Sequence, residues 1–368
     1  MFHHLWKLKG SRSFIDNYRD VMLAEGDGKF DSSLLRRDVM TAVSHMVPDS
    51  QVGSGPHGGA TDVGHLMTRA IFSLAGAALG SVAILYLDVV RAFASVRRRI
   101  ALPGDIEGEE HWLRWLLQCG FSADDASEII LAACSFINWA DAGAHPHAIA
   151  MLQAAHTRSW FSIEGLAQVY RYSKGAAAGT PLADLVYVIA MMFVLKELER
   201  KIDAAELSST ASCQGCCKYF ADDGDPTAVP SDTFRIRGPA YVDDVAIPRV
   251  TKACSIVGDM TIISKLAVQV FAAFRLTLNF AKGKSHVLIK FAGQGAGSAR
   301  RAFAAAGECL KFEVDGAQFV VHAVNMYKHL GTATTATLSL GMDLCMRFGS
   351  MRSALRPIAS RFLSQPPY

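Results

Sequence analysis

The chain lacks the signals of a secreted, a strongly basic or a dinucleotide-binding protein. Its formal net charge is only +3, so no global basic field indicates nucleic acid, and such a partner would have to be bound in a local groove. The segment from Met1 to Lys7 has no long apolar run, which predicts an intracellular protein, nuclear or cytoplasmic and not secreted. No Gly-x-Gly-x-x-Gly follows an expected strand, which argues against a doubly wound fold.

Cysteines are few and mostly scattered. There are eight, and the only cluster is Cys213, Cys216 and Cys217, in a stretch rich in Ser, Asp and Gly. A zinc site would need a fourth ligand at a recognisable spacing, and none is evident in the sequence. We therefore expect a reduced loop, and a metal knuckle is the less favoured alternative.

An uninterrupted membrane span is also missing. Residues Ala70 to Leu87 contain no charged side chain and approach the length of a span, but Gly76, Gly80 and Ser81 interrupt them. The last part is rich in β-branched and aromatic residues, which favour a strand. We predict a helix, a Gly-rich turn and a buried strand, with no membrane partner; a membrane span is the alternative.

The sequence has enough apolar residues, 51% of 368, to bury a core in two or three lobes. Ser32 is a candidate N-cap for a first helix that Pro48 stops. Further helices are expected at residues 60–75, 91–100, 109–118, 123–137, 181–202 and about 251–274. Strands are expected at 82–88, 159–163, 168–172, 234–242, 245–247 and about 284–291. This order predicts an α+β sheet with helices mostly behind it.

Two acidic segments stand out against this background. Tyr241-Val242-Asp243-Asp244 lies between apolar stretches, and Asp88 ends the apolar run that begins at Ile84. Adjacent carboxylates that face a third from a neighbouring strand are costly unless a cation offsets their charge. Their oxygens suit Mg²⁺, and paired ions promote phosphoryl displacement. The alternatives are a solvated hairpin turn for the pair and a helix N-cap before Arg91 for Asp88.

Eight segments, in order along the chain, resemble motifs of the reverse transcriptase domain of non-LTR (LINE-type) retrotransposons. They are KLKGSRSFIDNYRDVML (7 to 23), GDGKFDSSLLRR (26 to 37), QVGSGPHGGATD (51 to 62), LYLDVVRAFASV (85 to 96), GAAAGTPLADLVY (175 to 187), YVDD (241 to 244), LTLNFAKGKS (276 to 285) and YKHLG (327 to 331). Each segment is a weak signal alone, and the shared order makes the resemblance specific.

The resemblance implies a right-hand polymerase with an antiparallel palm sheet backed by helices. Fingers would occupy 1–80, the palm and remaining fingers elements 81–335 with a variable loop at 203–232, and the start of a thumb 336–368. Neither an endonuclease nor an RNase H region is seen, so we expect a piece of a larger element protein or a fragmentary gene copy. The related group II intron type would carry a maturase region, which is also not seen.

The implied reaction is RNA-directed DNA synthesis, in which a DNA primer on an RNA template is extended with deoxynucleoside triphosphates. By resemblance, Asp88 and Asp243 would bridge two Mg²⁺ ions, with Mn²⁺ as a substitute, and Asp244 would support them. The resemblance also implies that the backbone carbonyl of Val89 joins the metal shell.

Five further positions match nucleotide-binding residues of the family. Phe93 would lie beneath the incoming sugar, Lys9 and Arg19 would contact the triphosphate, and Gly179 would allow close backbone approach. Lys284 matches the lysine that protonates pyrophosphate; one extra residue separates it from Asn279, which leaves Lys282 as an alternative. A core role for Phe93 and a solvated loop for the basic pair also stay open.

The chain departs from the family pattern at several positions. Ala177 and Ala178 replace polar residues or proline, Ala94 replaces an acid, and the loop 57–59 lacks an arginine often found there. Contacts to template or nucleotide would be lost. A catalytically inactive nucleic-acid-binding remnant is therefore the alternative function, and the oligomeric state stays open.

Overall fold

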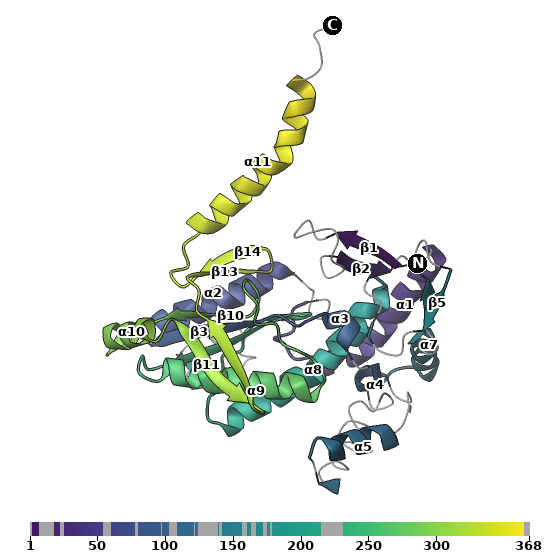
Figure 1. The fold of residues 1–368 in the computed structure, drawn as a ribbon, viewed down its shortest axis with the longest axis horizontal. Coiled ribbons are helices and arrows are strands. Elements are labelled where there is room, and N and C mark those ends of the chain that lie inside the picture. Colours follow the sequence, from purple (N-terminus) through teal and green to yellow (C-terminus); the bar gives the residue numbers. More distant parts are fainter. Residues whose placement is uncertain are drawn as a thin grey trace, which may run out of the picture.

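The computed structural model places a four-stranded antiparallel sheet at the centre of an α+β fold (Figure 1). The structure describes residues 2–6, 18–22, 26–53, 60–77, 80–96, 98–102, 109–120, 122–123, 139, 142–156, 160–162, 167–171, 175–176, 179–214 and 231–363. The predicted α+β class with an antiparallel sheet is confirmed.

The central sheet has the strand order β10-β3-β9-β8, and every neighbouring pair is antiparallel. The strands are β3 (Ser81–Leu87), β8 (Ala240–Tyr241), β9 (Asp244–Thr251) and β10 (His286–Lys290). All seven residues of β3 are buried, because strands flank it on both sides and helices cover both of its faces.

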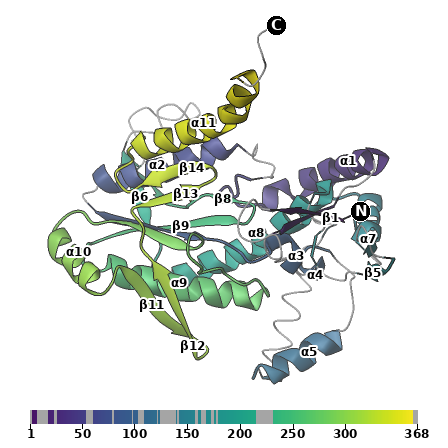
Figure 2. The same ribbon diagram turned by 45° about the horizontal axis from the view of Figure 1, so that its top comes forward.

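Alternate residues of β3 face different helices. Ala83, Leu85 and Leu87 belong to the larger core, which α8 (Pro181–Ala204) and α9 (Ile256–Ala273) complete on one face. The residues between them pack on the opposite face against α2 (Thr61–Ala77). Figures 1 and 2 show α2 on the other side of the sheet from α8 and α9. The helices therefore do not all lie behind the sheet, since α2 covers part of its front.

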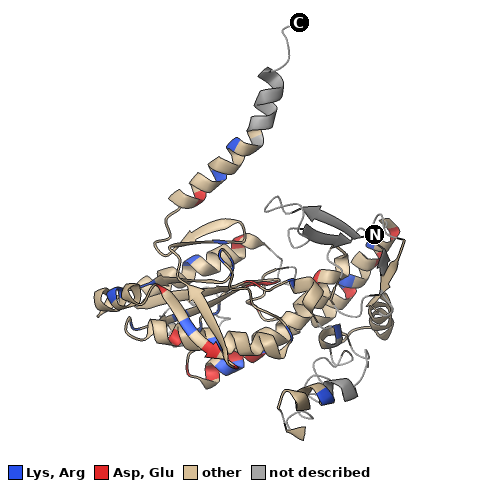
Figure 3. Cartoon of the chain, in the orientation of Figure 1, with Lys and Arg blue, Asp and Glu red and all other residues tan. Residues whose placement is uncertain are grey.

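Peripheral elements surround this centre. Those before α8 are β1 (Phe2–Trp6), β2 (Tyr18–Met22), α1 (Gly26–Val43), η2 (Ser44–Met46), α3 (Ala92–Ser95), α4 (Arg98–Ala101), α5 (Glu109–Gln118), α7 (Pro146–His156), β4 (Trp160–Ser162) and β5 (Val169–Arg171). Those after it are β6 (Thr210–Gln214), β7 (Ser231–Arg235), α10 (Ala296–Ala305), β11 (Cys309–Val314), β12 (Ala317–His322), β13 (Met326–His329), β14 (Thr332–Thr335) and α11 (Gly341–Leu363). Helix α11 extends away from the body in Figure 1, and Figure 3 shows both acidic and basic positions on it and on the β11–β12 hairpin.

The predicted division of residues 70–87 is confirmed for its helix and its strand, since α2 ends at Ala77 and β3 begins at Ser81. In the part of the chain that the structure describes, one helix, α9, is long and apolar enough to cross a membrane by length and composition. Of its 18 residues, 44% are buried, and the helix packs against β3, β9 and β11.

The helix predicted at 91–100 is wrong, because α3 and α4 are separated at Val96, which has an extended backbone. The segment before α8 explains the break. Ala176 N donates to Phe93 O at 2.7 Å and Gly175 N to Val96 O at 2.8 Å, so a distant segment takes carbonyls that a continuous helix would use. Arg98 Nε, in turn, donates to Gly175 O at 2.7 Å.

Several boundaries also differ from the predictions. Helix α1 begins at Gly26, so Ser32 lies inside it and is not its N-cap. The strand predicted at 234–242 is divided between β7 and β8, which belong to different sheets, and the predicted stub at 245–247 is part of the longer β9. The range 203–232, predicted as a loop, contains β6, which pairs with β7. The helix predicted at 123–137 lies, from residue 124 on, outside the described residues.

Candidate active site

Two strand registers bring the predicted acids and a lysine into one row. Leu87 pairs with Val245 across β3 and β9, and Tyr86 pairs with His286 across β3 and β10. Continuing both antiparallel registers places Asp88 beside Asp244 on one side and beside Lys284 on the other. Directly opposite residues of antiparallel strands project from the same face, so these three side chains share a face of the sheet.

Asp243 enters the row through a tight turn. Tyr241 pairs with Asp244, which leaves Val242 and Asp243 as the two residues of the turn between β8 and β9. Val242 has a φ of +58°, in the left-handed region that a β-branched residue rarely adopts. Such a conformation costs about 1–3 kcal/mol and persists only where the surroundings enforce it. The turn thus carries strain at the position directly before the acid pair.

Asp243 and Asp244 are harder to ionise than ordinary carboxylates. Burial is the main cause for both and raises the pKa of Asp244 to about 6, with further contributions from the charges of Asp243 and Asp88. Burial and the charge of Asp88 likewise raise the pKa of Asp243. The ammonium of Lys284 opposes both shifts. The three carboxylates therefore repel one another in a partly dehydrated place, where an added cation would be stabilised.

Asp88 is held by its neighbours and paired with a lysine. Its backbone N donates to Ser285 Oγ at 3.0 Å, its carbonyl accepts from Asn279 N at 2.8 Å, and its Oδ1 lies 3.0 Å from Lys284 Nζ. In the described residues, no group of three His, Cys, Asp or Glu side chains is close enough to hold a metal ion. Lys284 is thus the cation that Asp88 binds in this structure.

Val89 is of interest for its backbone carbonyl. It forms an isolated antiparallel bridge with Leu278, and the two hydrogen bonds of that bridge use Asp88 O and Val90 N. The carbonyl of Val89 is not part of them, which is compatible with the predicted backbone role. Its side chain is buried.

A buried tyrosine lies beneath the acids. The side chain of Tyr187, from α8, is fully buried, and its hydroxyl has no hydrogen-bond partner in the described part of the chain. Burial raises its pKa well above the usual value, with further contributions from Asp243, Asp244 and Asp88 in that order. The ring of Phe93 lies 5.1 Å from its ring, between centroids. Phe93 is therefore a neighbour of Tyr187 as well as a partly buried core residue.

Gly179 lies at the start of α8, on the segment that contacts Phe93. It has a φ of +97° and is exposed, and Pro181 opens the helix two residues later. The docking of Gly175 and Ala176 against the segment of Phe93 holds this stretch near α3. Ala177 and Ala178, where the sequence departs from the family pattern, lie outside the described residues.

The remaining predicted positions are only partly placed. Lys9 lies outside the described residues, and Arg19 belongs to β2 but its side chain is not described. Lys284 reaches Asp88, which distinguishes it from the alternative Lys282.

Sequence reasoning missed three residues that adjoin the acids, namely Gln51, Tyr187 and Tyr327. Tyr327 donates its hydroxyl to Lys284 O at 2.9 Å, and burial followed by the charges of Asp244 and Asp88 raises its pKa. Its ring stacks on Tyr86 with centroids 4.3 Å apart. Gln51 binds the backbone of Val242. All three lie within or beside segments that carry the family resemblance, but no local signal specified their contacts.

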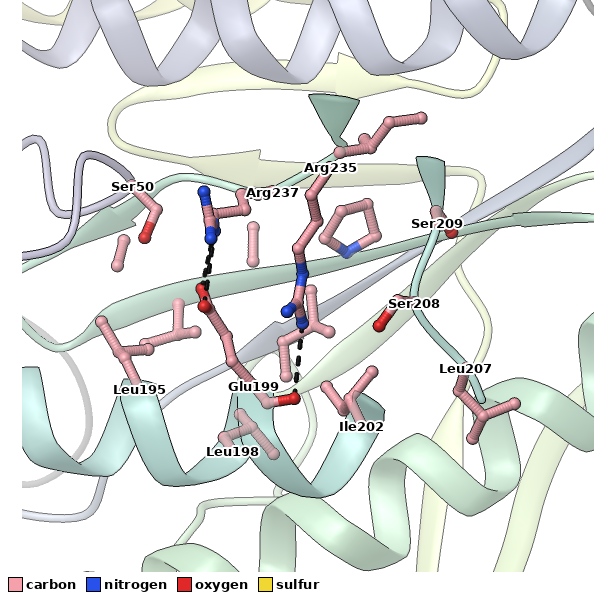
Figure 4. Close-up of a pocket in the computed structure, with 17 residues that line it drawn as sticks. Ser50, Leu195, Leu198, Glu199, Ile202, Leu207, Ser208, Ser209, Arg235 and Arg237 are labelled. Atoms are coloured by element: carbon pink, nitrogen blue, oxygen red, sulfur yellow. Dashed lines mark hydrogen bonds and ion pairs between the residues drawn. The ribbon is translucent and has the colours of Figure 1, made fainter. Parts of the chain in front are cut away.

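A second charged region, the arginine pocket, lies between the end of α8 and the strands β7 to β9 (Figure 4). Its volume is about 50 Å³. Arg237 Nε lies 3.2 Å from Glu199 Oε1, and Arg235 pairs with Asp203 and donates to Glu199 O at 3.4 Å. Glu199, in the lining, and Asp203, beside the pocket, each have an arginine partner, and hydrogen bonds from Ser208 and Arg235 lower the pKa of Asp203.

A scan against protein-family models finds no match for the chain, and a comparison with curated proteins finds no significant match either. A functional assignment therefore depends on the residues and their geometry.

Proposed function

We propose that the chain is an RNA-directed DNA polymerase of the non-LTR retrotransposon type. The observation that carries the proposal is the row of Asp244, Asp88 and Lys284 at the ends of three adjacent strands, β9, β3 and β10, with Asp243 in the adjoining turn. Strongly perturbed carboxylates that gather at one place are typical of functional sites. The motif order in the sequence supports this activity over other uses of an acidic cluster.

The chemistry of the donor set suits Mg²⁺. The three side chains offer only carboxylate oxygens, which hard divalent cations prefer, and their mutual repulsion would decrease on cation binding. Asp88 and Asp243 would hold the ions, Asp244 would support them, and the carbonyl of Val89, which the bridge to Leu278 does not use, would join them. When bound, Mg²⁺ would help to ionise the primer hydroxyl and would neutralise charge on the leaving group.

Lys284 provides a proton and a positive charge at the same place. The primer 3′-hydroxyl would release its proton to water, its oxygen would form a bond to the α-phosphorus, the bond from that phosphorus to the bridging oxygen would break, and pyrophosphate would leave. The Lys284 side chain is about half exposed (47%), so it can move from Asp88 to the departing oxygen and donate a proton to it. Phe93 would lie under the incoming sugar and exclude a 2′-hydroxyl, and Gly179 would let the backbone approach the nucleotide.

The same proposal assigns the parts of the fold. The central sheet with α8 and α9 would form the palm within residues 81–335, and the elements of 1–80 would contribute fingers. Helix α11, which extends from the β13–β14 hairpin, would begin the thumb in 336–368. RNA template and DNA primer would then lie over the face of the sheet that carries the acid row.

Primer extension on an RNA template with Mg²⁺ tests the function. We expect the wild-type chain to incorporate nucleotides and the double variant Asp243→Asn/Asp244→Asn to lose incorporation. A matched control, Glu199→Gln/Asp203→Asn, removes the same number of negative charges from the arginine pocket and should retain activity. Equal incorporation by the wild type and the first double variant would contradict the proposal.

A second candidate function is favoured by the pairing of Asp88 with Lys284, which neutralises the charge of one predicted metal ligand. An inactive remnant would bind RNA or an RNA–DNA hybrid with an affinity that falls steeply with salt, because basic side chains would displace counterions from phosphates. It would incorporate no nucleotide at any Mg²⁺ concentration. Binding and extension measured on one preparation distinguish the two functions.

A further inference from the structure

The turn before the acid pair needs external support. Val242 is buried, its φ of +58° is unfavourable for a β-branched side chain, and only the short strand β8 precedes it. A two-residue strand contributes few hydrogen bonds of its own. A different part of the chain must therefore hold the turn in this conformation.

Gln51 supplies that support from 191 residues away in the sequence. Its Oε1 accepts from Val242 N at 3.0 Å, and its Nε2 donates to Val242 O at 3.5 Å. The side chain has no exposed surface, so water does not compete for these contacts. One amide thus satisfies both backbone groups of the strained residue.

Backbone contacts place Gln51 beside β8. Ala240 N donates to Ser50 O at 2.7 Å, and Val52 N donates to Ala240 O at 2.8 Å, which forms a parallel bridge between Gln51 and Ala240. The segment 50–52 therefore lies along the outer edge of the sheet. It fixes the position of the Gln51 amide relative to the turn.

Gly53 allows this segment to lie so close. A Cβ atom added there would lie 2.7 Å from Tyr241 Cγ and 2.8 Å from Val242 N, distances that real Cβ atoms do not show. Gly53 N also donates to Gln51 Oε1, at 3.4 Å. Two residues of this segment are thus suited to contact with the turn: Gln51 binds its backbone, and Gly53 leaves room for the close approach.

We propose that Gln51 is a positioning residue for Asp243 and Asp244, acting through the backbone of Val242. By holding the turn, it fixes the angle at which both carboxylates meet Asp88, and hence the geometry available to a divalent cation. The inference rests on the proposed polymerase function, which it deepens by adding a support for the metal-binding acids. The contacts themselves do not depend on that function.

The test compares Gln51→Leu with a control that is structural only. Leucine has a similar volume but cannot bind the Val242 backbone. The control is Ser209→Ala. It removes a buried hydroxyl that accepts a hydrogen bond from Val250 N at 2.8 Å, at the opposite end of β9 from Asp244. We expect Gln51→Leu to lower kcat by about 10- to 100-fold, as loss of such supporting contacts does, and to raise the Mg²⁺ concentration for half-maximal rate. The KM for template-primer should be unchanged, and Ser209→Ala should change none of these.

A double-mutant cycle with Val242→Gly separates support of the turn from general packing. Glycine adopts a positive φ without strain, so the turn of the Val242→Gly variant should depend less on Gln51. We expect Gln51→Leu to lower kcat by a smaller factor in the Val242→Gly background than in the wild type. An equal factor in both backgrounds would overturn the proposal.

Hydrogen exchange of the peptide that spans the turn gives a readout without activity. Gln51→Leu should accelerate exchange of the Val242 amide, and Ser209→Ala should not. If the wild type incorporates no nucleotide while exchange changes as expected, the polymerase function fails and the support of the turn stands. Unchanged exchange, or unchanged kcat and Mg²⁺ requirement in an active enzyme, would overturn the role of Gln51.

Discussion

The acid row and the arginine pocket both adjoin strand β9, yet they differ in how negative charge is compensated. Glu199 in the pocket and Asp203 beside it each have an arginine partner, and the pKa of Asp203 is lowered. In the acid row, one lysine faces three carboxylates, and burial raises the pKa of Asp243 and Asp244. The pocket is balanced by the chain itself, whereas the acid row has an excess of negative charge that an external cation would balance.

Replacing one acid in each region should give the largest difference in nucleotide incorporation between two variants. We expect Asp88→Asn to lower nucleotide incorporation by at least about 10³-fold, the order found when a group that stabilises transition-state charge is lost. Asp203→Asn, which removes the partner of Arg235 beside the pocket, should leave incorporation unchanged. Single-turnover primer extension measures both. Similar losses in the two variants would show that the charge contrast has no functional meaning.

Removing the lysine should affect catalysis and cation binding in opposite directions. Lys284→Met should lower incorporation by about 10²-fold, the lower range for loss of a general acid. It should also strengthen Mn²⁺ binding to the free protein, measured by electron paramagnetic resonance, because the ammonium no longer competes for Asp88. Lys282→Met is the matched control and should change neither quantity. Weaker Mn²⁺ binding by Lys284→Met would contradict competition between the two cations.

The raised pKa of Asp244 predicts a pH-dependent stability of the metal-free protein. Its folded-state pKa of about 6 exceeds the ordinary value of 3.8, so between these values the folded state binds a proton that the unfolded chain has released. The free energy of unfolding therefore falls as pH rises through this window. Asp244→Asn removes the effect, so the variant should be more stable than the wild type above pH 6, by about 1–3 kcal/mol, and equally stable below about pH 4.

Urea denaturation without divalent cations, at several pH values, measures this difference. Added Mg²⁺ at pH 7 should reduce it, because a bound cation would stabilise the ionised carboxylate of the wild type. A variant that is less stable than the wild type above pH 6 would show that Asp244 is satisfied without a cation.

The smallest effect is expected in the pocket. Glu199→Gln breaks the ion pair with Arg237, whose side chain is 43% exposed, and should change the free energy of unfolding by less than about 1 kcal/mol. The same urea experiment measures it, and the result should not depend on Mg²⁺. A larger or Mg²⁺-dependent change would mean that the two regions are coupled.

Local sequence signals predicted the elements that carry the acids. The β-branched and aromatic run before Asp88 predicted β3, and the apolar stretches around Asp243 predicted a hairpin. The choice between Lys284 and Lys282 could not be made from spacing, because it depends on the register of β10 with β3. Pairing between distant strands decides which side chains meet.

Contacts between distant segments also explain what the sequence predictions got wrong or missed. The helix predicted at 91–100 is broken by carbonyl contacts with Gly175 and Ala176, about 80 residues later in the chain. Gln51 meets the turn only because its segment pairs with Ala240. No periodicity within either segment encodes such partners. The polymerase function and its individual site residues stay predictions, since their motifs specify chemistry that only assays can test.

Strand β3 pairs with β9 on one side and with β10 on the other, and both pairings bring residues of the candidate site together. The site is therefore sensitive to the number of residues in these two neighbouring strands. Side chains alternate between the faces of a strand, so loss of one codon from β9 would move Asp244 to the opposite face if the far end kept its pairing. Loss of two codons would return it to the correct face but shift it by about 7 Å along the strand. In a gene that accumulates small in-frame deletions, this row would therefore be lost before the hydrophobic core that surrounds it.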